Sequence, residues 1–176
     1  MCTDKIESTS KTSSKKRCTN TSCAVFEKKM TEKNLTVGFT CGAFDILHTG
    51  HALMLEECKS VCDYLIVGLQ TDPTIDRPNK NKPVQSLEER RVMLNAVRHV
   101  DEIMIYETEE ELHCLLKSLK FHYPKLIRIL GADWKGKEFT GKDLQIETFF
   151  NSRDHNYSSS SLRERIWEAE SGKRTT

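Results

Sequence analysis

The stretch T-V-G-F-T-C-G-A-F-D-I-L-H-T-G-H, residues 36–51, decides the fold. It starts as a strand, because Val37 and Phe39 are apolar and a β-branched threonine follows them. The small residues Gly42 and Ala43 come next, and an apolar helical run begins directly after the stretch. A strand, a glycine-containing turn and a helix start form an anion site, because free backbone N–H groups and the positive helix end point the same way.

The stretch also carries an acid and two histidines. Asp45 follows the turn, and His48 and His51 are separated by Thr49 and Gly50. Two imidazoles three positions apart at a helix start lie on one face and can face one bound group. A metal pair or two ordinary helix-start histidines are the alternatives. Asp45 either orients a backbone turn or a histidine, lies near a metal, or simply caps the helix.

Composition limits the class of protein. The chain has 176 residues, 27 Lys plus Arg and 26 Asp plus Glu, so its net charge does not favour nucleic acid as a partner. No apolar stretch approaches the roughly 20 residues of a membrane span, and the first residues carry no secretory signal. Several of the seven cysteines fall in or beside expected strands and helices, so we interpret them as reduced thiols of a cytoplasmic protein.

Residues 1–34 are rich in Ser, Thr and Lys and too poor in apolar residues for a core, which predicts a disordered tail. Cys18 and Cys23 within it lack the further ligands of a zinc site. Residues 35–170 are expected to form one domain. Further strands are expected at 64–69, 102–106, 125–130 and 145–150, and helices at 51–60, 86–98, 109–119 and from 158 to 170.

This alternation predicts an α/β fold, a Rossmann-like parallel sheet flanked by helices. Ligands of such sheets bind outside the carboxyl ends of the strands. The proline-containing segment 71–85 is expected to be a functional loop. Leu53, Leu55 and Cys58 are expected to face inward from the first helix. In the second helix we expect Arg90 to face solvent or pair with a glutamate, and Val92, Met93, Ala96 and Val97 to face inward.

Several separated motifs carry a family resemblance. The run G-A-F-D-I-L-H-T-G-H, with its H-x-G-H core, resembles the signature of the HIGH-type nucleotidyltransferase superfamily. Within it, the run is similar to that of small bacterial cytidylyltransferases of the glycerol-3-phosphate cytidylyltransferase type. The segment L-G-A-D-W, residues 130–134, is similar to the family's G-D-D-W. The segment R-D-H-N-Y-S-S-S, residues 153–160, is similar to R-T-x-G-I-S-T-T, with Arg153 and the serines matching.

The resemblance implies a set of site residues. His48, His51, Lys80 and Arg153 are expected to be catalytic. The nucleotide is expected to contact Gly42, Ala43, Phe44, Asp45, His51, Gly131, Asp133, Arg153, Ser158, Ser159 and Ser160. The acceptor is expected to contact Lys80 or Lys82, Arg98, Asp133 and Trp134, although Trp134 also suits the role of a packed anchor for its loop.

The implied reaction transfers CMP from CTP to a small phosphorylated alcohol, with glycerol 3-phosphate as the leading acceptor. It needs positioning and charge stabilisation rather than a nucleophilic side chain. Mg²⁺ is expected to arrive with the triphosphate, without a dedicated protein metal site. The alternatives are an adenylyltransferase that uses ATP with a sugar phosphate or FMN, and an idle nucleotide-binding module. Relatives of this size are often dimers, so a homodimer is one expected assembly.

Overall fold

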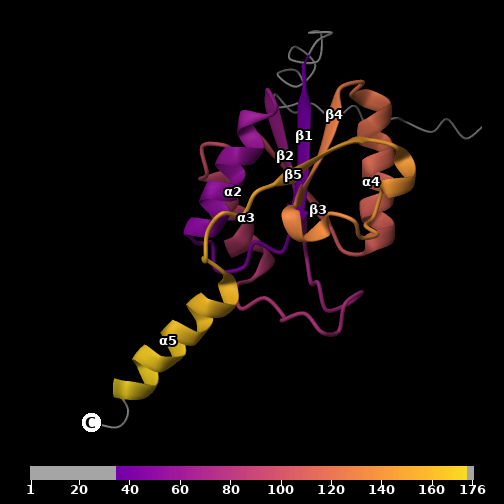
Figure 1. Cartoon of the computed structure of the whole chain (residues 1–176). Helices are drawn as coiled ribbons and strands as arrows, with labels where there is room; N and C mark the ends of the chain where they lie inside the picture. Colours follow the sequence, from indigo (N-terminus) through magenta and orange to yellow (C-terminus); the bar gives the residue numbers. More distant parts are fainter. Residues whose placement is uncertain (1–34, 174–176) are drawn as a thin grey trace, which may run out of the picture. The chain divides into compact units, whose positions relative to one another are not determined.

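The computed structural model describes residues 35–173, and the expectations for residues 1–34 and for the chain end lie outside it. Its centre is a five-stranded parallel sheet with the order β3-β2-β1-β4-β5 (Figure 1). The strands are β1 Val37–Gly42, β2 Tyr64–Gln70, β3 Glu102–Tyr106, β4 Leu126–Gly131 and β5 Glu147–Asn151. The predicted Rossmann-like α/β fold is confirmed.

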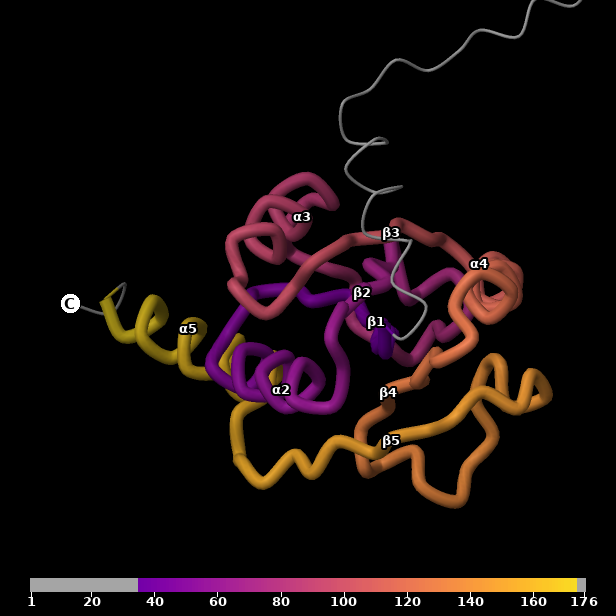
Figure 2. The backbone as a smooth tube through the Cα atoms, turned by 90° about the horizontal axis from the view of Figure 1, so that it is seen from above, coloured from indigo at the N-terminus to yellow at the C-terminus, as the bar shows by residue number. Residues whose placement is uncertain are grey.

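Helices cover both faces of the sheet. Figure 2 shows α2 and α3 on one face and α4 on the other. Their bounds are α2 Thr49–Ser60, α3 Leu87–Asn95 and α4 Glu109–His122. Short 3-10 turns, η1 Ala132–Trp134 and η2 Lys142–Leu144, interrupt the segment between β4 and β5. Within the described range, no helix is long and apolar enough to cross a membrane.

The last helix, α5 Ser159–Lys173, differs from the others because no residue of it is buried. It begins near the carboxyl edge of the sheet and extends away from the helices that cover the sheet (Figure 1). Only its first turns therefore contribute to the region around the motifs.

The strand order reverses between β1 and β4. These strands pair only from Val37 to Phe39, whereas β1 and β2 pair along the whole of β1. Beyond Phe39 the chains of β1 and β4 separate, so a crevice opens at their carboxyl ends. Such a switch point is where α/β sheets bind ligands.

Two apolar cores hold the helices to the sheet. Leu112 and Leu116 of α4 pack with Phe39 on one face. Leu55 of α2 and Leu94 of α3 pack on the other. All five side chains are buried, and each stabilises the fold by about 1.5–3 kcal/mol relative to an exposed position.

The inward faces of two helices differ from the expectation. In α2, Leu55 and Cys58 are buried as predicted, but Leu53 is exposed. In α3, Val92 and Met93 are exposed. Ala96 and Val97 follow the last helical residue, and of these Ala96 is exposed whereas Val97 packs partly buried against the core, as expected. The buried positions of α3 are Arg90 and Leu94, four apart, which is the spacing of one helix face. The predicted buried face of α3 was wrong because Arg90 was assigned to solvent.

The boundaries differ by a few residues. The helix α3 ends at Asn95 rather than Arg98, because Val97–Val100 forms turns ahead of β3. The helix α4 continues past Leu119 to His122, and α5 continues past Glu170 to Lys173. None of these shifts moves a motif from one edge of the sheet to the other.

Candidate active site

The first motif folds into a cap for α2. The Nδ1 atom of His48, the N-cap residue, accepts a hydrogen bond from the Gly50 N–H at 3.0 Å. The Nδ1 atom of His51 accepts one from the His48 N–H at 3.4 Å. Because a backbone N–H can only donate, both Nδ1 atoms are unprotonated, and each neutral ring carries its hydrogen on Nε2. The ring centroids lie 4.0 Å apart, so the two donors sit side by side.

The serine run folds against this cap. Ser158 starts α5, since its Oγ accepts a hydrogen bond from the Ser161 N–H at 3.1 Å. The Oγ of the next residue, Ser159, lies 3.2 Å from His48 Nε2 and donates to the Asp45 carbonyl at 3.3 Å. Two motifs that are more than 100 residues apart in the sequence therefore meet at one point.

Gly50 permits this close approach. A Cβ atom at this position would lie 2.8 Å from Cε1 of His155 and 3.0 Å from Cβ of Tyr157. Contacts below 3.0 Å are too short for a real Cβ, so any larger residue would push the second motif away. The glycine of H-x-G-H is thus a packing requirement between the two motifs.

Burial keeps the two imidazoles neutral. Burial, together with smaller contributions from the neighbouring His48 and Arg153, lowers the pKa of His51 to about 4. Burial also lowers the pKa of His48, with a smaller contribution from His155. At neutral pH both rings are uncharged hydrogen-bond donors through Nε2.

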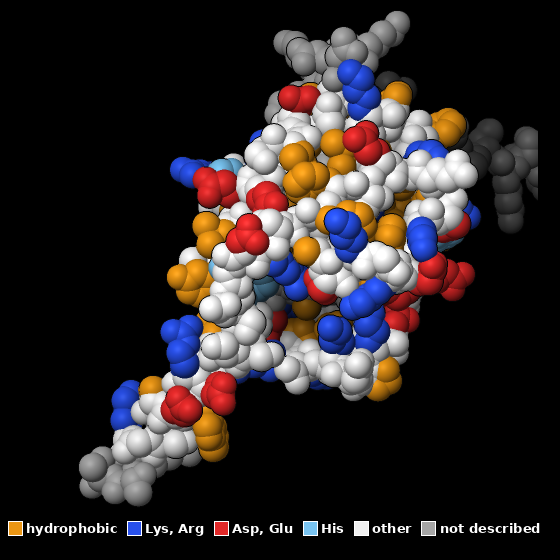
Figure 3. Space-filling view, in the orientation of Figure 1, with side chains coloured by type: hydrophobic (Ala, Val, Ile, Leu, Met, Phe, Trp, Pro, Cys, Tyr) orange, Lys and Arg blue, Asp and Glu red, His pale blue; other side chains and the backbone are white. Residues whose placement is uncertain are grey.

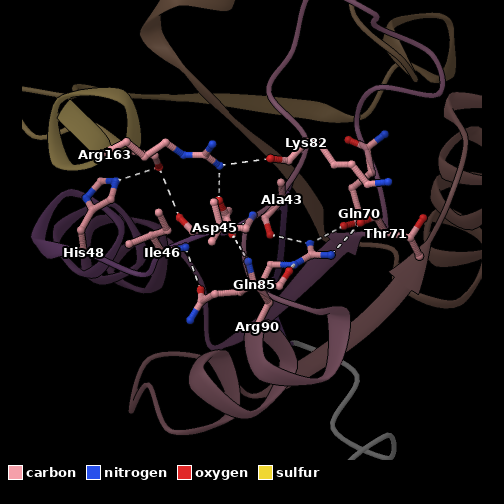
Figure 4. Close-up of polar contacts among 12 residues, drawn as sticks. Ala43, Asp45, Ile46, His48, Gln70, Thr71, Lys82, Gln85, Arg90 and Arg163 are labelled. Carbon is pink, nitrogen blue, oxygen red and sulfur yellow. Dashed lines mark hydrogen bonds and ion pairs between the residues drawn. The ribbon is translucent and has the colours of Figure 1, made fainter. Parts of the chain in front are cut away.

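Asp45 fixes the loop 71–85 against the first motif. Its Oδ1 accepts hydrogen bonds from the N–H groups of Val84 and Gln85 at 3.0 and 2.9 Å, and its Oδ2 pairs with Arg163 of α5 (Figure 4). Burial alone would raise its pKa, but these bonds outweigh burial and lower the pKa. Of the interpretations of Asp45, the structure shows the one in which it orients a backbone turn, because His48 is the helix cap.

Arg90 is buried, which corrects the expectation that it faces solvent or a glutamate. Its guanidinium donates to the carbonyls of Ala43, Gln70 and Thr71 at 2.6–2.8 Å, as Figure 4 shows. Its Nε donates to the Gln85 carbonyl at 3.2 Å. One side chain thereby joins the turn after β1, the end of β2 and both ends of the loop.

The L-G-A-D-W segment lies at the end of β4. Asp133 pairs with Arg153 of the second motif at 3.1 Å. A Cβ on Gly131 would lie 2.4 Å from Asp133 Oδ1 and 2.8 Å from Arg153 Nε, so a larger residue here would require the two paired side chains to shift. The guanidinium of Arg77 lies 5.5 Å from the centre of the Trp134 ring, which anchors the loop 71–85 to η1.

A cavity of about 110 Å³ opens at this edge of the sheet. It runs from the switch point between β1 and β4 toward the ends of β2 and β3. Among the predicted site residues it touches Gly42, Gly131, Trp134 and Arg153. Its other walls are Thr40, Cys41, Met54, Gln70, Arg77, Tyr106, Glu109, Leu112, Arg128, Ile129, Leu130, Phe139 and Thr140.

Four predicted acceptor residues do not line this cavity, and one of them, Asp133, lies next to it in its pair with Arg153. Lys80 and Lys82 are exposed on the loop, and Lys82 lies 3.8 Å from Asp72. Arg98 precedes β3 at the opposite, amino edge of the sheet, where it pairs with Glu56 at 3.4 Å. In a parallel sheet a residue just ahead of a strand lies away from the carboxyl ends, so we do not retain Arg98 as an acceptor ligand.

Sequence reasoning did not predict the role of several residues at this edge. Arg90 and Arg128 bond to carbonyls of distant segments, and Arg163 pairs with an acid 118 residues away. His155 stands inside the second motif at a variable position, and its buried ring lies against Gly50 and Tyr157. Only His155 had a local signal, its place between Arg153 and the serines.

Comparison with known proteins decides the family. A family model described as cytidylyltransferase-like matches residues 39–165. The chain belongs to the cytidylyltransferase-like family. It is therefore a member of the HIGH nucleotidyltransferase superfamily, as the motifs had indicated.

The chain is similar to part of a larger bacterial protein. It is 36% identical over 129 residues to the bifunctional protein HldE of Helicobacter pylori strain Shi470, covering 73% of this chain and 27% of HldE. It is 37% identical over 134 residues to HldE of Helicobacter acinonychis strain Sheeba, covering 76% of this chain and 28% of HldE. The chain spans about a quarter of the length of these curated relatives.

Solved structures show the same fold. A lipopolysaccharide core biosynthesis protein from Thermoplasma volcanium matches 68% of this chain and 98% of its own, with 25% identity and a TM-score of 0.53. A bifunctional NMN adenylyltransferase/ADP ribose pyrophosphatase from Francisella tularensis, complexed with AMP and a manganese ion, matches 77% of this chain and 42% of its own. At 14% identity and a TM-score of 0.56, this second likeness concerns the fold alone.

Proposed function

We propose that this protein transfers a nucleoside monophosphate from a nucleoside triphosphate to the phosphate of a small phosphorylated sugar or alcohol, and releases pyrophosphate. The acceptor phosphate oxygen attacks the α-phosphorus, and the bond from that phosphorus to the β-phosphate oxygen breaks. The observation that carries this proposal is the contact of His48 with Ser159, which joins an imidazole pair to a hydroxyl-lined helix start.

The geometry suits a triphosphate. The start of α5 offers orphan N–H groups and serine hydroxyls to the β- and γ-phosphates. The Nε2 donors of His48 and His51 stand next to it and suit the α-phosphate, where charge builds during attack. Arg153 follows the end of β5 and is half-exposed, so a phosphate can replace Asp133 as its partner.

The neutral state of the imidazoles serves the same step. When the triphosphate binds, its negative charge raises the pKa of both rings, which strengthens their hydrogen bonds as charge develops on the α-phosphate. The protein then needs no nucleophilic side chain, because the acceptor phosphate is already an anion.

The residues fit a metal that arrives with the nucleotide. In the described part of the chain, no three His, Cys, Asp or Glu side chains gather into a metal site, and Asp45 is held by backbone N–H groups and Arg163. Phosphate oxygens and water would then supply most ligands of Mg²⁺. Bound in this way, Mg²⁺ neutralises charge on the triphosphate.

Two nucleotide and acceptor pairs have support. CTP with a phosphorylated alcohol, glycerol 3-phosphate first among them, is favoured by the cytidylyltransferase-like family and by Asp133 and Trp134 of the L-G-A-D-W segment. ATP with a sugar phosphate is favoured by the similarity to HldE. An idle binding module is disfavoured, because both histidines are present and are held as donors.

A pyrophosphate-release screen tests the proposal. The four nucleoside triphosphates are each combined with Mg²⁺ and a panel of sugar phosphates and polyol phosphates, glycerol 3-phosphate included. We expect release with CTP or ATP and one class of acceptor, and a nucleoside diphosphate-linked product of matching mass. Tight triphosphate binding without release from any pair would favour the idle module.

A further inference from the structure

Arg128 is a buried cation with no carboxylate partner. It lies in the middle of β4, is 3% exposed, and forms no ion pair with any described residue. Its guanidinium donates to the carbonyls of Phe39 and Ile129 at 3.3 and 3.4 Å and to the Cys41 sulfur at 3.1 Å. Its Nε, also buried, has no hydrogen-bond partner within the described range.

Arg90 shows what a structurally satisfied arginine looks like in the same domain. Both of its terminal nitrogens form bonds of 2.6–2.8 Å to carbonyl oxygens, and its Nε has a carbonyl partner. Arg128 has longer bonds, a soft sulfur acceptor and one orphan N–H, and its guanidinium lies over the Phe39 ring, 5.2 Å from the ring centre. A buried charge is costly unless it is paired, so the surroundings of Arg128 leave room for an anion from outside.

The cavity at the carboxyl edge supplies that room. Arg128 forms part of its wall, together with Arg77 and Arg153. Glu109 is the one carboxylate among the lining residues, and it is already bound to Arg77 and to Thr140. The volume of about 110 Å³ holds several waters and therefore a phosphate group. Figure 3 shows Lys and Arg side chains gathered around a hollow in the lower half of the domain.

The position of the cavity relates it to the proposed reaction. One end reaches Gly42 and Arg153, next to the segments expected to hold the triphosphate. The other end reaches Gln70 and Tyr106 at the ends of β2 and β3, away from the start of α5. A phosphate held near Arg128 would thus stand beside the triphosphate rather than in its place.

We propose that this cavity is the subsite for the phosphate of the acceptor, and that Arg128, with Arg77 on the same cavity wall, binds that phosphate before attack. The inference rests on the proposed function and refines it. It assigns the acceptor phosphate to the buried Arg128 and the partly exposed Arg77 in place of the exposed loop lysines Lys80 and Lys82. A guanidinium suits this task because it can bind two phosphate oxygens at once.

Inorganic phosphate is the probe that tests the subsite. The full chain is first saturated with CTP or ATP, whichever binds, so that phosphate cannot occupy the triphosphate site. Phosphate is then titrated by calorimetry into wild type, Arg128→Gln and Arg91→Gln. Arg91 is the matched control, because it is exposed on α3 and pairs with Glu88.

We expect Arg128→Gln to weaken phosphate binding at least tenfold, with triphosphate affinity within threefold of wild type and Arg91→Gln unchanged. Unchanged phosphate affinity in folded Arg128→Gln would overturn the subsite. An equal loss of triphosphate affinity would instead assign the cavity to the nucleotide and also overturn it. Failure of the chain to bind any triphosphate would instead count against the proposed function. The failure of the subsite and the failure of the proposed function therefore give different results.

A measurement on wild type covers the case in which Arg128→Gln does not fold. Crystals grown with the triphosphate are soaked in inorganic phosphate. We expect phosphate density within hydrogen-bond distance of the Arg128 guanidinium. An ordered triphosphate with phosphate density only at Lys80 or Lys82 would overturn the inference while leaving the proposed function standing.

Discussion

The Nε2 atom of His48 lies 3.2 Å from the Oγ atom of Ser159, although 111 residues separate them in the sequence. This contact joins the cap of α2 to the start of α5. Gly50 makes it possible, because its missing side chain leaves space for His155 and Tyr157. The two motifs are therefore held together by packing between two helix starts.

Replacing His51 tests the role of the imidazole pair in catalysis. We expect His51→Asn to lower kcat by about 10²–10³, the usual cost of losing one donor to a developing charge. The Michaelis constant for the triphosphate should change much less. His122→Asn is the control, because His122 is exposed at the end of α4. Near-normal turnover of folded His51→Asn would show that this ring takes no part in the reaction.

The low pKa of His51 predicts a dependence of stability on pH. The folded ring has a pKa of about 4, below the usual value of 6.5, so in the range between them the unfolded chain binds more protons than the folded chain. The contribution of His51 to the free energy of unfolding should be constant above pH 6.5. It should fall by up to about 3 kcal/mol as the pH approaches 4. Urea unfolding at several pH values measures this.

His51→Gln separates this effect from other titrations. We expect the variant to lose part of the decrease between pH 6.5 and 4, since glutamine does not bind a proton there. His122→Gln should retain the wild-type decrease. Identical slopes for His51→Gln and wild type would mean that His51 is not held neutral by the fold.

Arg90 should be essential for stability. In Arg90→Met, the carbonyls of Ala43, Gln70 and Thr71 lose their donor in a buried position, so we expect a loss of about 3 kcal/mol or more. Arg91→Met, one residue along the same helix, removes only an exposed pair with Glu88 and should cost less than about 1 kcal/mol. Chemical unfolding compares the two variants, and equal losses would refute the role given to Arg90.

Gly50→Ala tests the packing between the motifs. The added Cβ would lie 2.8 Å from His155, so we expect a destabilisation of about 1–3 kcal/mol together with weaker triphosphate binding. Gly172→Ala in α5 is the control, because a Cβ there meets nothing within 4 Å. Wild-type stability and affinity in Gly50→Ala would show that the two segments do not need this contact.

The sequence correctly predicted the features that depend on local residue patterns. The apolar runs of β1 and β2 predicted buried strands, and the Ser86 capping box predicted the start of α3. The H-x-G-H run and the serine run indicated two phosphate-binding helix starts at the carboxyl edge. Their contact is a property of the parallel fold, in which both helices follow strands that end at that edge.

The sequence did not predict the contacts of side chains that bond to backbone groups of distant segments. Nothing near Arg90 or Arg128 in the sequence marks the carbonyls that they bind. In the sequence, an arginine that will be buried therefore looks the same as an exposed one. Because Arg90 was assumed to be exposed, the buried face of α3 was predicted wrongly. Arg98 could have been placed from topology alone, since a residue ahead of a parallel strand lies at the amino edge.

The central claim is that the two motifs close on the same triphosphate. Equilibrium titration of wild type, His48→Asn and Ser159→Ala with the triphosphate identified in the screen tests it most directly. We predict that each folded variant binds about tenfold or more weakly, since each loses a charge-assisted hydrogen bond of about 1.5–3 kcal/mol. Wild-type affinity in either variant would contradict the claim, because one of the two motifs would then lie outside the triphosphate site.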